Sequence, residues 1–207
     1  MRSLQPHCEL TLKQPNLGYR FSADSVHLAD FVQISPHDTL IDLCTGVGAI
    51  PLLLRQRCNF KRAFGIELQD ELCQIARYNI EANQLEGQIH ILQADVRRIT
   101  PAKIRELAAF EYPEFCDVVS VNPPYFRLGE GRLNTNCQKS IARHEITLTL
   151  PELLATCRRI LHSDGRLHLA HRRAREAEII QELQTQGFRR IGRRVVLGDL
   201  LLLEARS

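Results

Sequence analysis

Several features are missing from this 207-residue sequence, and each absence excludes a class of protein. No apolar run approaches the ~20 residues that cross a bilayer, so we expect no membrane partner. The first seven residues lack the apolar core of a signal peptide, which makes the cytoplasm the expected compartment. The seven cysteines are scattered without a C-x-x-C pair, so we expect neither a disulfide framework nor a metal site. Internal repeats, low-complexity segments and a second domain are also absent.

Charge is unevenly distributed along the chain. The formal net charge is +3, but residues 151–207 hold eleven arginines against seven acidic residues, whereas residues 1–150 are slightly acidic. Several of these arginines occur in pairs, which is consistent with phosphate contact because the guanidinium fork matches phosphate oxygens. Solvated helix faces produce the same pattern. The pairs are Arg158-Arg159, Arg172-Arg173, Arg189-Arg190 and Arg193-Arg194.

From residue 39 onward, apolar strands alternate with amphipathic helices, which predicts an α/β sheet with crossover helices on both faces. After Gly187 the pattern changes to two apolar runs around Gly198-Asp199, which predicts a final antiparallel hairpin in an otherwise parallel sheet. We predict strands at 39–44, 62–67, 88–93, 116–121 and 165–170, helices at 48–58, 70–84, 101–110, 150–162 and 174–186, and hairpin strands at 193–197 and 200–204.

The tetrapeptide Asn122-Pro123-Pro124-Tyr125 follows a predicted buried strand. Proline lacks the backbone N–H that a sheet ladder needs, so the chain leaves the sheet here as a stiff turn. Ligands bind at this edge in open α/β sheets. A planar ring with an amino group fits the turn, because the amino group can donate to the Asn122 side-chain oxygen and the Pro123 carbonyl while the ring stacks on Tyr125. An ordinary exit from a strand gives the same residues.

Three acidic residues stand at the ends of three successive predicted strands: Asp42, Glu67 and Asp95. Asp42 begins a loop whose Thr45, Gly46 and Gly48 allow a ligand to approach the backbone. Glu67, nineteen residues after Gly48, suits a ribose hydroxyl pair, and Asp95 suits an adenine amino group.

The loop has neither the G-x-G-x-x-G pattern nor a P-loop lysine, and Asp42 would repel a pyrophosphate. A nucleoside with positive charge fits better, and S-adenosylmethionine meets that description. Taken singly, each acid is equally explained as a helix cap or a solvated loop end.

The order of these features resembles the class I S-adenosylmethionine-dependent amino methyltransferases, whose members methylate adenine N6, cytosine N4, guanine N2 or a glutamine amide. The resemblance covers about 39–207 and implies a Rossmann-like fold with Asn122, Pro123, Pro124 and Tyr125 as catalytic residues. It implies cofactor contacts from Asn122 and from the loop and strand-end residues named above. Residues 1–38 would form an N-terminal appendage packed over the cofactor site, and 39–207 the methyltransferase domain.

The flanking segments resemble the tRNA1(Val) adenine-N6 methyltransferases more narrowly. The resemblance rests on 17–25 (Leu-Gly-Tyr-Arg-Phe-Ser-Ala-Asp-Ser), on the aromatic residue after the tetrapeptide, on 142–145 (Ala-Arg-His-Glu) and on the terminal 203–206. It implies a tRNA substrate, methylated at the adenosine 3′ of a valine anticodon, with weaker substrate contacts from Phe126, Arg143 and His144. Cys44 departs from the family pattern, because it stands where the first loop glycine is usual.

Three functions remain open from the sequence. The first is adenine-N6 methylation of tRNA, and the second is the same chemistry on an rRNA guanine, a DNA base or a protein glutamine. The third is a cofactor- or RNA-binding module without catalysis. The sequence leaves monomer and dimer equally open.

Overall fold

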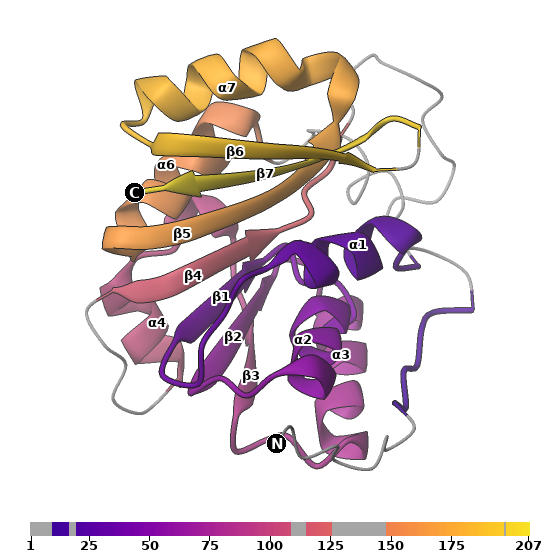
Figure 1. Cartoon of the computed structure of the whole chain (residues 1–207). Helices are drawn as coiled ribbons and strands as arrows, with labels where there is room; N and C mark the ends of the chain where they lie inside the picture. The colour runs from indigo at the N-terminus through magenta and orange to yellow at the C-terminus, as the bar shows by residue number, and fades with distance from the viewer. Residues whose placement is uncertain (1–9, 17–19, 109–114, 126–147, 197) are drawn as a thin grey trace, which may run out of the picture.

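The structure is a computed structural model of the chain, and it describes residues 10–16, 20–108, 115–125, 148–196 and 198–207. Within these residues the chain forms one seven-stranded sheet in the order β3-β2-β1-β4-β5-β7-β6 (Figure 1). The strands are β1 (Thr39–Leu43), β2 (Arg62–Glu67), β3 (Ile89–Gln93), β4 (Cys116–Val121), β5 (Leu161–Arg172), β6 (Arg189–Val196) and β7 (Leu200–Arg206).

The first five strands pair in parallel, and β7 runs antiparallel to both of its neighbours. This arrangement confirms the predicted mostly parallel sheet with an antiparallel pair at its carboxyl-terminal end. The central strands are apolar and buried along their length, as expected where helices cover both faces of a parallel sheet.

Helices cover both faces of the sheet and create two apolar cores. One core lies under α1 (Ala23–Phe31), α2 (Ala49–Arg57) and α3 (Asp70–Ala82). The other lies under α4 (Pro101–Ala108), α6 (Leu150–Ile160) and α7 (Glu176–Thr185). Two short 3-10 turns, η1 (Val96–Arg98) and η2 (Arg173–Arg175), follow β3 and β5. None of the described helices is both long and apolar enough to cross a membrane.

The described part of the N-terminal segment lies against α3. The side-chain amide of Asn79 accepts from Lys13 N (2.7 Å) and donates to Lys13 O (2.9 Å), and Asn83 makes the same pair of bonds with Thr11 (3.1 and 2.7 Å). A short strand is one interpretation of residues 10–12 from the sequence, and this is wrong, because two asparagine side chains satisfy this backbone where a neighbouring strand would otherwise do so.

Strand β5 extends further than the predicted 165–170, from Leu161 to Arg172. Gly165 permits this, because a Cβ there would lie 2.6 Å from a side-chain atom of Leu161. The extension carries β5 past the end of β4, which pairs with it up to Leu169. Residues 170–172 therefore stand beside the turn that follows β4.

Candidate active site

The candidate site is built at the carboxyl edge of the parallel strands, where each strand gives way to a loop. Asp42 lies in β1, Glu67 ends β2 and Asn122 follows β4 directly. The pairing of β1 with both β2 and β4 brings Asp42 level with Gly65 on one side and Ser120 on the other. The structure thus places the acidic loop and the Asn-Pro-Pro-Tyr turn on adjacent strands.

Asp42 is completely buried, and its carboxylate oxygens accept one hydroxyl each. Ser120 Oγ donates to Oδ1 and Thr45 Oγ to Oδ2, both at 2.6 Å. Burial raises the pKa of Asp42 to about 7, although the two hydroxyl donors lower it, and the Glu67 charge adds to the rise. A cation bound nearby would stabilise the ionised form of this buried carboxylate and so lower its pKa.

The loop after Asp42 turns through a series of left-handed residues. Cys44, Gly46 and Gly48 have φ of 57°, 58° and 78°, a region that favours glycine because a Cβ crowds the backbone there. Cys44 occupies it despite its side chain, and burial raises the pKa of its thiol well above the usual value. Gly65 of β2 lets the loop approach, since a Cβ there would lie 2.8 Å from the Thr45 side chain.

The Glu67 carboxylate ties this loop to the start of α3. Its Oε2 accepts from Gly46 N (2.9 Å), and its Oε1 accepts from Leu68 N (2.9 Å) and Gln69 N (3.0 Å). Burial raises the pKa of Glu67 against these three donors. A carboxylate has about four acceptor positions, so Glu67 retains one for a ligand hydroxyl.

Asp95 has a local partner in the structure. It caps η1 by accepting from Arg97 N at 3.0 Å, and its Oδ2 pairs with the Arg97 guanidinium at 2.6 Å. The hydrogen bond from Arg97 is the largest influence on the pKa of Asp95, which it lowers. In this structure Asp95 therefore acts as a helix cap, which is one of the two interpretations that its position in the sequence allows.

In the tetrapeptide turn, both the nitrogen and the oxygen of the Asn122 carboxamide form hydrogen bonds. Asn122 Nδ2 donates to Ser25 Oγ of α1 at 3.1 Å, and the Tyr125 hydroxyl donates to Asn122 Oδ1. Pro123 is buried, whereas Asn122, Pro124 and Tyr125 are half-buried. The phenol of the same motif thus takes one of the two acceptor positions of the oxygen expected to receive an amino group.

Three residues at or just after the end of β5 contact Tyr125, and the sequence did not indicate these contacts. The His171 ring lies 5.2 Å from the Tyr125 ring, the Arg172 guanidinium lies 5.0 Å from the same ring, and Arg175 donates to Tyr125 O at 3.3 Å. From the sequence, Arg172 belongs to an arginine pair consistent with phosphate contact, and His171 is interpreted as structural or solvated; neither pattern indicates a contact with Tyr125. Only the register of β5 against β4 brings these residues to the turn.

His171 itself is fully buried and neutral. Arg172 N donates to its Nδ1 at 2.8 Å, so the ring proton is on Nε2, which has no hydrogen-bond partner. Burial, followed by the charge of Arg175, lowers the pKa of His171 to about 3. An imidazole in this state is an uncharged ring that packs against Tyr125 and has one unused donor.

The weaker candidates Phe126, Arg143 and His144 lie outside the described residues. Among the described residues, no three His, Cys, Asp or Glu side chains gather in a way that would hold a metal ion.

The strand order and the polar carboxyl edge define a class I methyltransferase fold, and solved structures share it. A predicted O-methyltransferase from Agrobacterium tumefaciens superposes with a TM-score of 0.65 at 22% identity, covering 88% of this chain and 80% of that one. TrmN from Thermus thermophilus superposes with a TM-score of 0.62 at 22% identity, covering 88% and 48%. Residues 22–144 match the family model described as "Histone methylation protein DOT1", and because this is more than half of the chain, the chain belongs to that family.

Curated relatives carry a different name. The tRNA1(Val) (adenine(37)-N6)-methyltransferase of Aliivibrio salmonicida is 27% identical over 149 residues, which are 72% of this chain and 58% of that protein. The enzyme of the same name from Phocaeicola vulgatus is 25% identical over 76% of this chain and 61% of its own length. In these two alignments the chain spans about three fifths of the relative.

Proposed function

We propose that the chain is an S-adenosylmethionine-dependent methyltransferase that methylates the exocyclic N6 of an adenine in tRNA. The observation that carries the proposal is the position of the Asn122–Tyr125 turn, on the strand next to the buried Asp42 and its glycine loop. The relatives named as tRNA1(Val) adenine-N6 methyltransferases support the substrate, and adenosine 37 is the proposed position. A tRNA substrate also favours action in the cytoplasm.

The residues of the acidic loop fit this cofactor, which supplies a methyl group already activated on a sulfonium. Asp42 is a buried carboxylate with only two hydroxyl partners, so a positively charged ligand would stabilise its ionised form. Gly46 and Gly48 keep the loop backbone close to a ligand, and Glu67 has an acceptor position left for a ribose hydroxyl. We propose Asp42, Thr45, Gly46, Gly48, Glu67, Asp95 and Asn122 as the cofactor-binding set, with Asp95 exchanging its Arg97 partner.

The turn after β4 would hold the adenine. Asn122 Oδ1 and Pro123 O would each accept one amino hydrogen, which directs the N6 lone pair toward the methyl group, and positioning is the main task because the methyl group is already activated. Tyr125 would stack on the base, a contact worth about 1–3 kcal/mol. The Tyr125 hydroxyl already donates to Asn122 Oδ1, and because an amide oxygen has two lone pairs, a second acceptor position remains there for an amino hydrogen.

We propose that residues 1–38 form an appendage that supports both halves of the site. Its α1 supplies Ser25 to the Asn122 amide, and Asn79 joins Lys13 to the carbonyl of Val47 in the glycine loop at 2.9 Å. Phe21 and Leu12 pack with Val47 in a small apolar cluster next to this loop. Residues 39–207 form the methyltransferase domain.

Two other functions use the same residues. The first is amino methylation of another substrate: an rRNA guanine, a DNA base or a protein glutamine. The family description, which names histone methylation, supports a protein substrate. The second is a binding module without catalysis, for which the non-glycine residue Cys44 in the loop is the supporting observation.

Radiolabelled methyl transfer would separate these functions. The purified chain and labelled cofactor are incubated with total tRNA from cells that lack the corresponding gene, and the nucleosides are then analysed. Label recovered as N6-methyladenosine supports the proposal, while label in another base or in protein supports a different amino acceptor. Cofactor binding with no transfer to any of these substrates supports the module.

A further inference from the structure

The edge strand β6 contains four arginines, Arg189, Arg190, Arg193 and Arg194, and no acidic residue. All four are exposed. The Arg193 guanidinium pairs with Glu176 of α7, whereas the other three have no acidic partner among the described residues. Of the other acids of α7, Glu178 pairs with Arg175, and Glu182 accepts from the amide of Gln186 and forms no ion pair with these arginines. Three of the four guanidinium groups on this edge are therefore exposed and have no ion-pair partner among the described residues.

Strand register places these arginines in a line that leads away from the candidate site. Arg194 is level with Leu202 and, through it, with Ala170 near the carboxyl end of β5. Arg189 is level with Arg206 and, through it, with Arg166 near the other end of β5. At a rise of ~3.3 Å per residue, the line begins about 7 Å from the carboxyl edge and ends about 20 Å from it.

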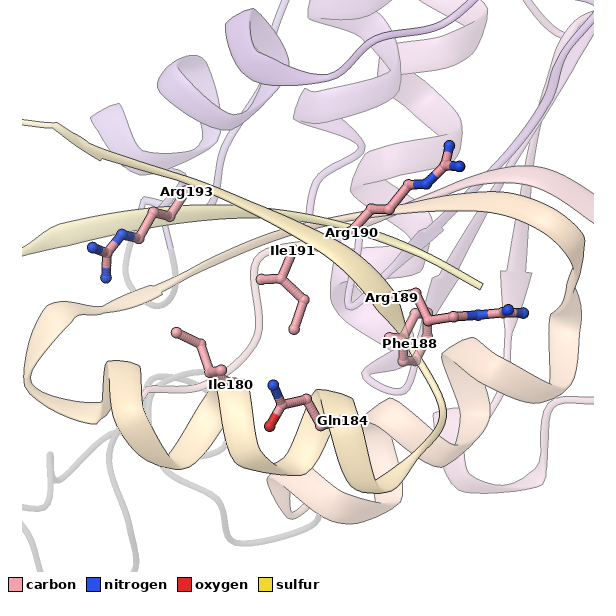
Figure 2. Close-up of a pocket in the computed structure, with 7 residues that line it drawn as sticks. All are labelled: Ile180, Gln184, Phe188, Arg189, Arg190, Ile191 and Arg193. Carbon is pink, nitrogen blue, oxygen red and sulfur yellow. The ribbon is translucent and has the colours of Figure 1, made fainter.

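A bulge distributes the arginines over both sides of the strand. The register shifts between Arg189 and Gly192, and Arg190 has a φ of 50°, which is unusual for a residue with a side chain. Figure 2 shows Arg190 directed away from α7, on the opposite side of the ribbon from Ile191. Backbone strain of this kind is often found where side chains are aimed at a ligand.

Three of the four arginines, Arg189, Arg190 and Arg193, contribute to the lining of a hollow of about 560 Å³ beside α7. Its lining residues are Ile180, Gln184, Phe188, Arg189, Arg190, Ile191 and Arg193. In Figure 2, Ile180, Gln184 and Ile191 surround the hollow, and Arg189 and Arg193 lie toward its two ends. An apolar floor between guanidinium groups matches a nucleotide, whose base has a planar face and whose phosphates are anionic.

We propose that β6 and the hollow beside α7 bind the phosphate backbone of the substrate RNA and so set its direction across the molecule. This inference rests on the proposed function and deepens it, because the RNA would run from the Asn-Pro-Pro-Tyr turn down the edge of the sheet. Guanidinium groups bind phosphate oxygens through paired N–H donors. The same charge disfavours a lysine-rich protein as the partner of this surface.

Charged side chains on an edge strand also prevent edge-to-edge pairing of sheets. That role needs no affinity for phosphate, so measurements of RNA binding separate it from the proposal. The informative variant is the double substitution Arg190→Gln and Arg194→Gln. Its matched control, Lys61→Gln with Arg105→Gln, removes two exposed charges of the same sign before β2 and on α4.

The experiment measures binding of a fluorescently labelled transcript of the valine tRNA anticodon arm across a series of salt concentrations. We expect the β6 double variant to bind about tenfold more weakly at low salt and to lose about 1.4 from the slope of log affinity against log salt, near 0.7 for each phosphate contact. The control should change affinity by less than about twofold. Thermal melting and cofactor affinity should match the unaltered chain for both variants.

Equal salt slopes for the β6 variant and the control would overturn the proposal, even if methyl transfer to tRNA were intact. If the unaltered chain binds the RNA through β6 but methylates no adenine, the proposed function is wrong and the RNA-binding role of β6 is supported. If the unaltered chain binds no RNA, both fail. Binding of a polylysine peptide in place of the RNA would also overturn the proposal.

Discussion

The two sides of the sheet differ in the sign and the exposure of their charged side chains. Around β1 and β2, Asp42 and Glu67 are buried and receive hydroxyl or backbone donors. Around β5, β7 and β6 the charges are arginines, most of them exposed and several without an acidic partner among the described residues. A buried acid selects a small cation that can replace water, whereas exposed guanidinium groups attract a large polyanion that stays hydrated. The comparison predicts that changes on the first side alter protonation and catalysis, and that changes on the second alter RNA affinity alone.

The largest expected effect is at the junction of the two sides, in Asn122→Ala. Removal of the carboxamide takes away an acceptor that would act in the transition state, so we expect kcat to fall by at least ~10³-fold. Cofactor affinity, measured by calorimetry, should fall by less than about threefold, because the other six residues of the proposed cofactor-binding set remain. Ser25→Ala is the matched control, because it removes only the partner of Asn122 Nδ2. Retained turnover in Asn122→Ala would refute the catalytic assignment.

The side with the buried acids makes a pH-dependent prediction through Asp42. Its folded-state pKa of about 7 lies above the ordinary aspartate value of 3.8, so between these values the folded state binds the proton more tightly than the unfolded state. Raising the pH through this window therefore lowers the free energy of unfolding, by ~1.4 kcal/mol per unit at most. We expect the stability of Asp42→Asn, relative to that of the unaltered chain, to rise by about 2–3 kcal/mol on going from pH 5 to pH 8. Urea unfolding at each pH measures this.

Asp42→Asn should bind the cofactor more weakly even where it is more stable, because the carboxylate that would face a cation is gone. The unaltered chain should release a proton on cofactor binding below pH 7, which calorimetry in buffers of different ionisation enthalpy detects. A stability difference that stays constant from pH 5 to pH 8 would contradict the burial of an ionisable Asp42.

The next effect concerns His171, which we regard as a positioning residue acting through Tyr125. His171→Ala removes the ring that packs 5.2 Å from Tyr125, so we expect KM for tRNA to rise about tenfold while kcat changes by less than about threefold. His171→Phe keeps an aromatic ring and should restore KM if packing is the role. If both variants lower kcat and leave KM unchanged, His171 does not act by placing the stacking residue.

Sequence reasoning located the elements whose evidence is local, and missed those that depend on register. The alternation of apolar strands with amphipathic helices, and the final hairpin pattern, predicted the mostly parallel sheet, which the strand order and pairing confirm. The contacts of His171, Arg172 and Arg175 with Tyr125 depend on the extension of β5 beyond its pairing with β4. The bond from Asn122 to Ser25 spans 97 residues, and no pattern in either segment indicates it.

The sequence also did not show which partner each polar side chain bonds. Asp95 suits an adenine amino group by its position, yet Arg97, two residues away, takes both carboxylate oxygens. Asn79 and Asn83 occur in an amphipathic helix as ordinary polar residues, yet their amides hold the backbone of Lys13 and Thr11. In each case the sequence identified a polar group and the structure decided its partner.

A smaller effect is expected in the glycine loop. Cys44 holds a left-handed backbone, with φ of 57°, at a cost of about 1 kcal/mol. We expect Cys44→Gly to raise the free energy of unfolding by up to about 1 kcal/mol and to leave methyl transfer intact. Cys44→Ala is the control, because it retains the Cβ and therefore the strain. A loss of activity in Cys44→Gly with full stability would instead show that the thiol contributes to the site.

The smallest effect separates the paired arginine from its unpaired neighbours on β6. The Arg193 side chain is 66% exposed where it meets Glu176, and exposed ion pairs contribute about 0–1 kcal/mol because water and salt screen them. We expect Arg193→Gln to change the free energy of unfolding by less than about 0.5 kcal/mol. Because Glu176 already compensates this charge, the variant should also weaken binding of the anticodon-arm RNA by less than about threefold. A loss as large as that of Arg190→Gln with Arg194→Gln would mean that RNA displaces Glu176, and that the hollow facing α7 carries as much of the contact as the opposite side of the strand.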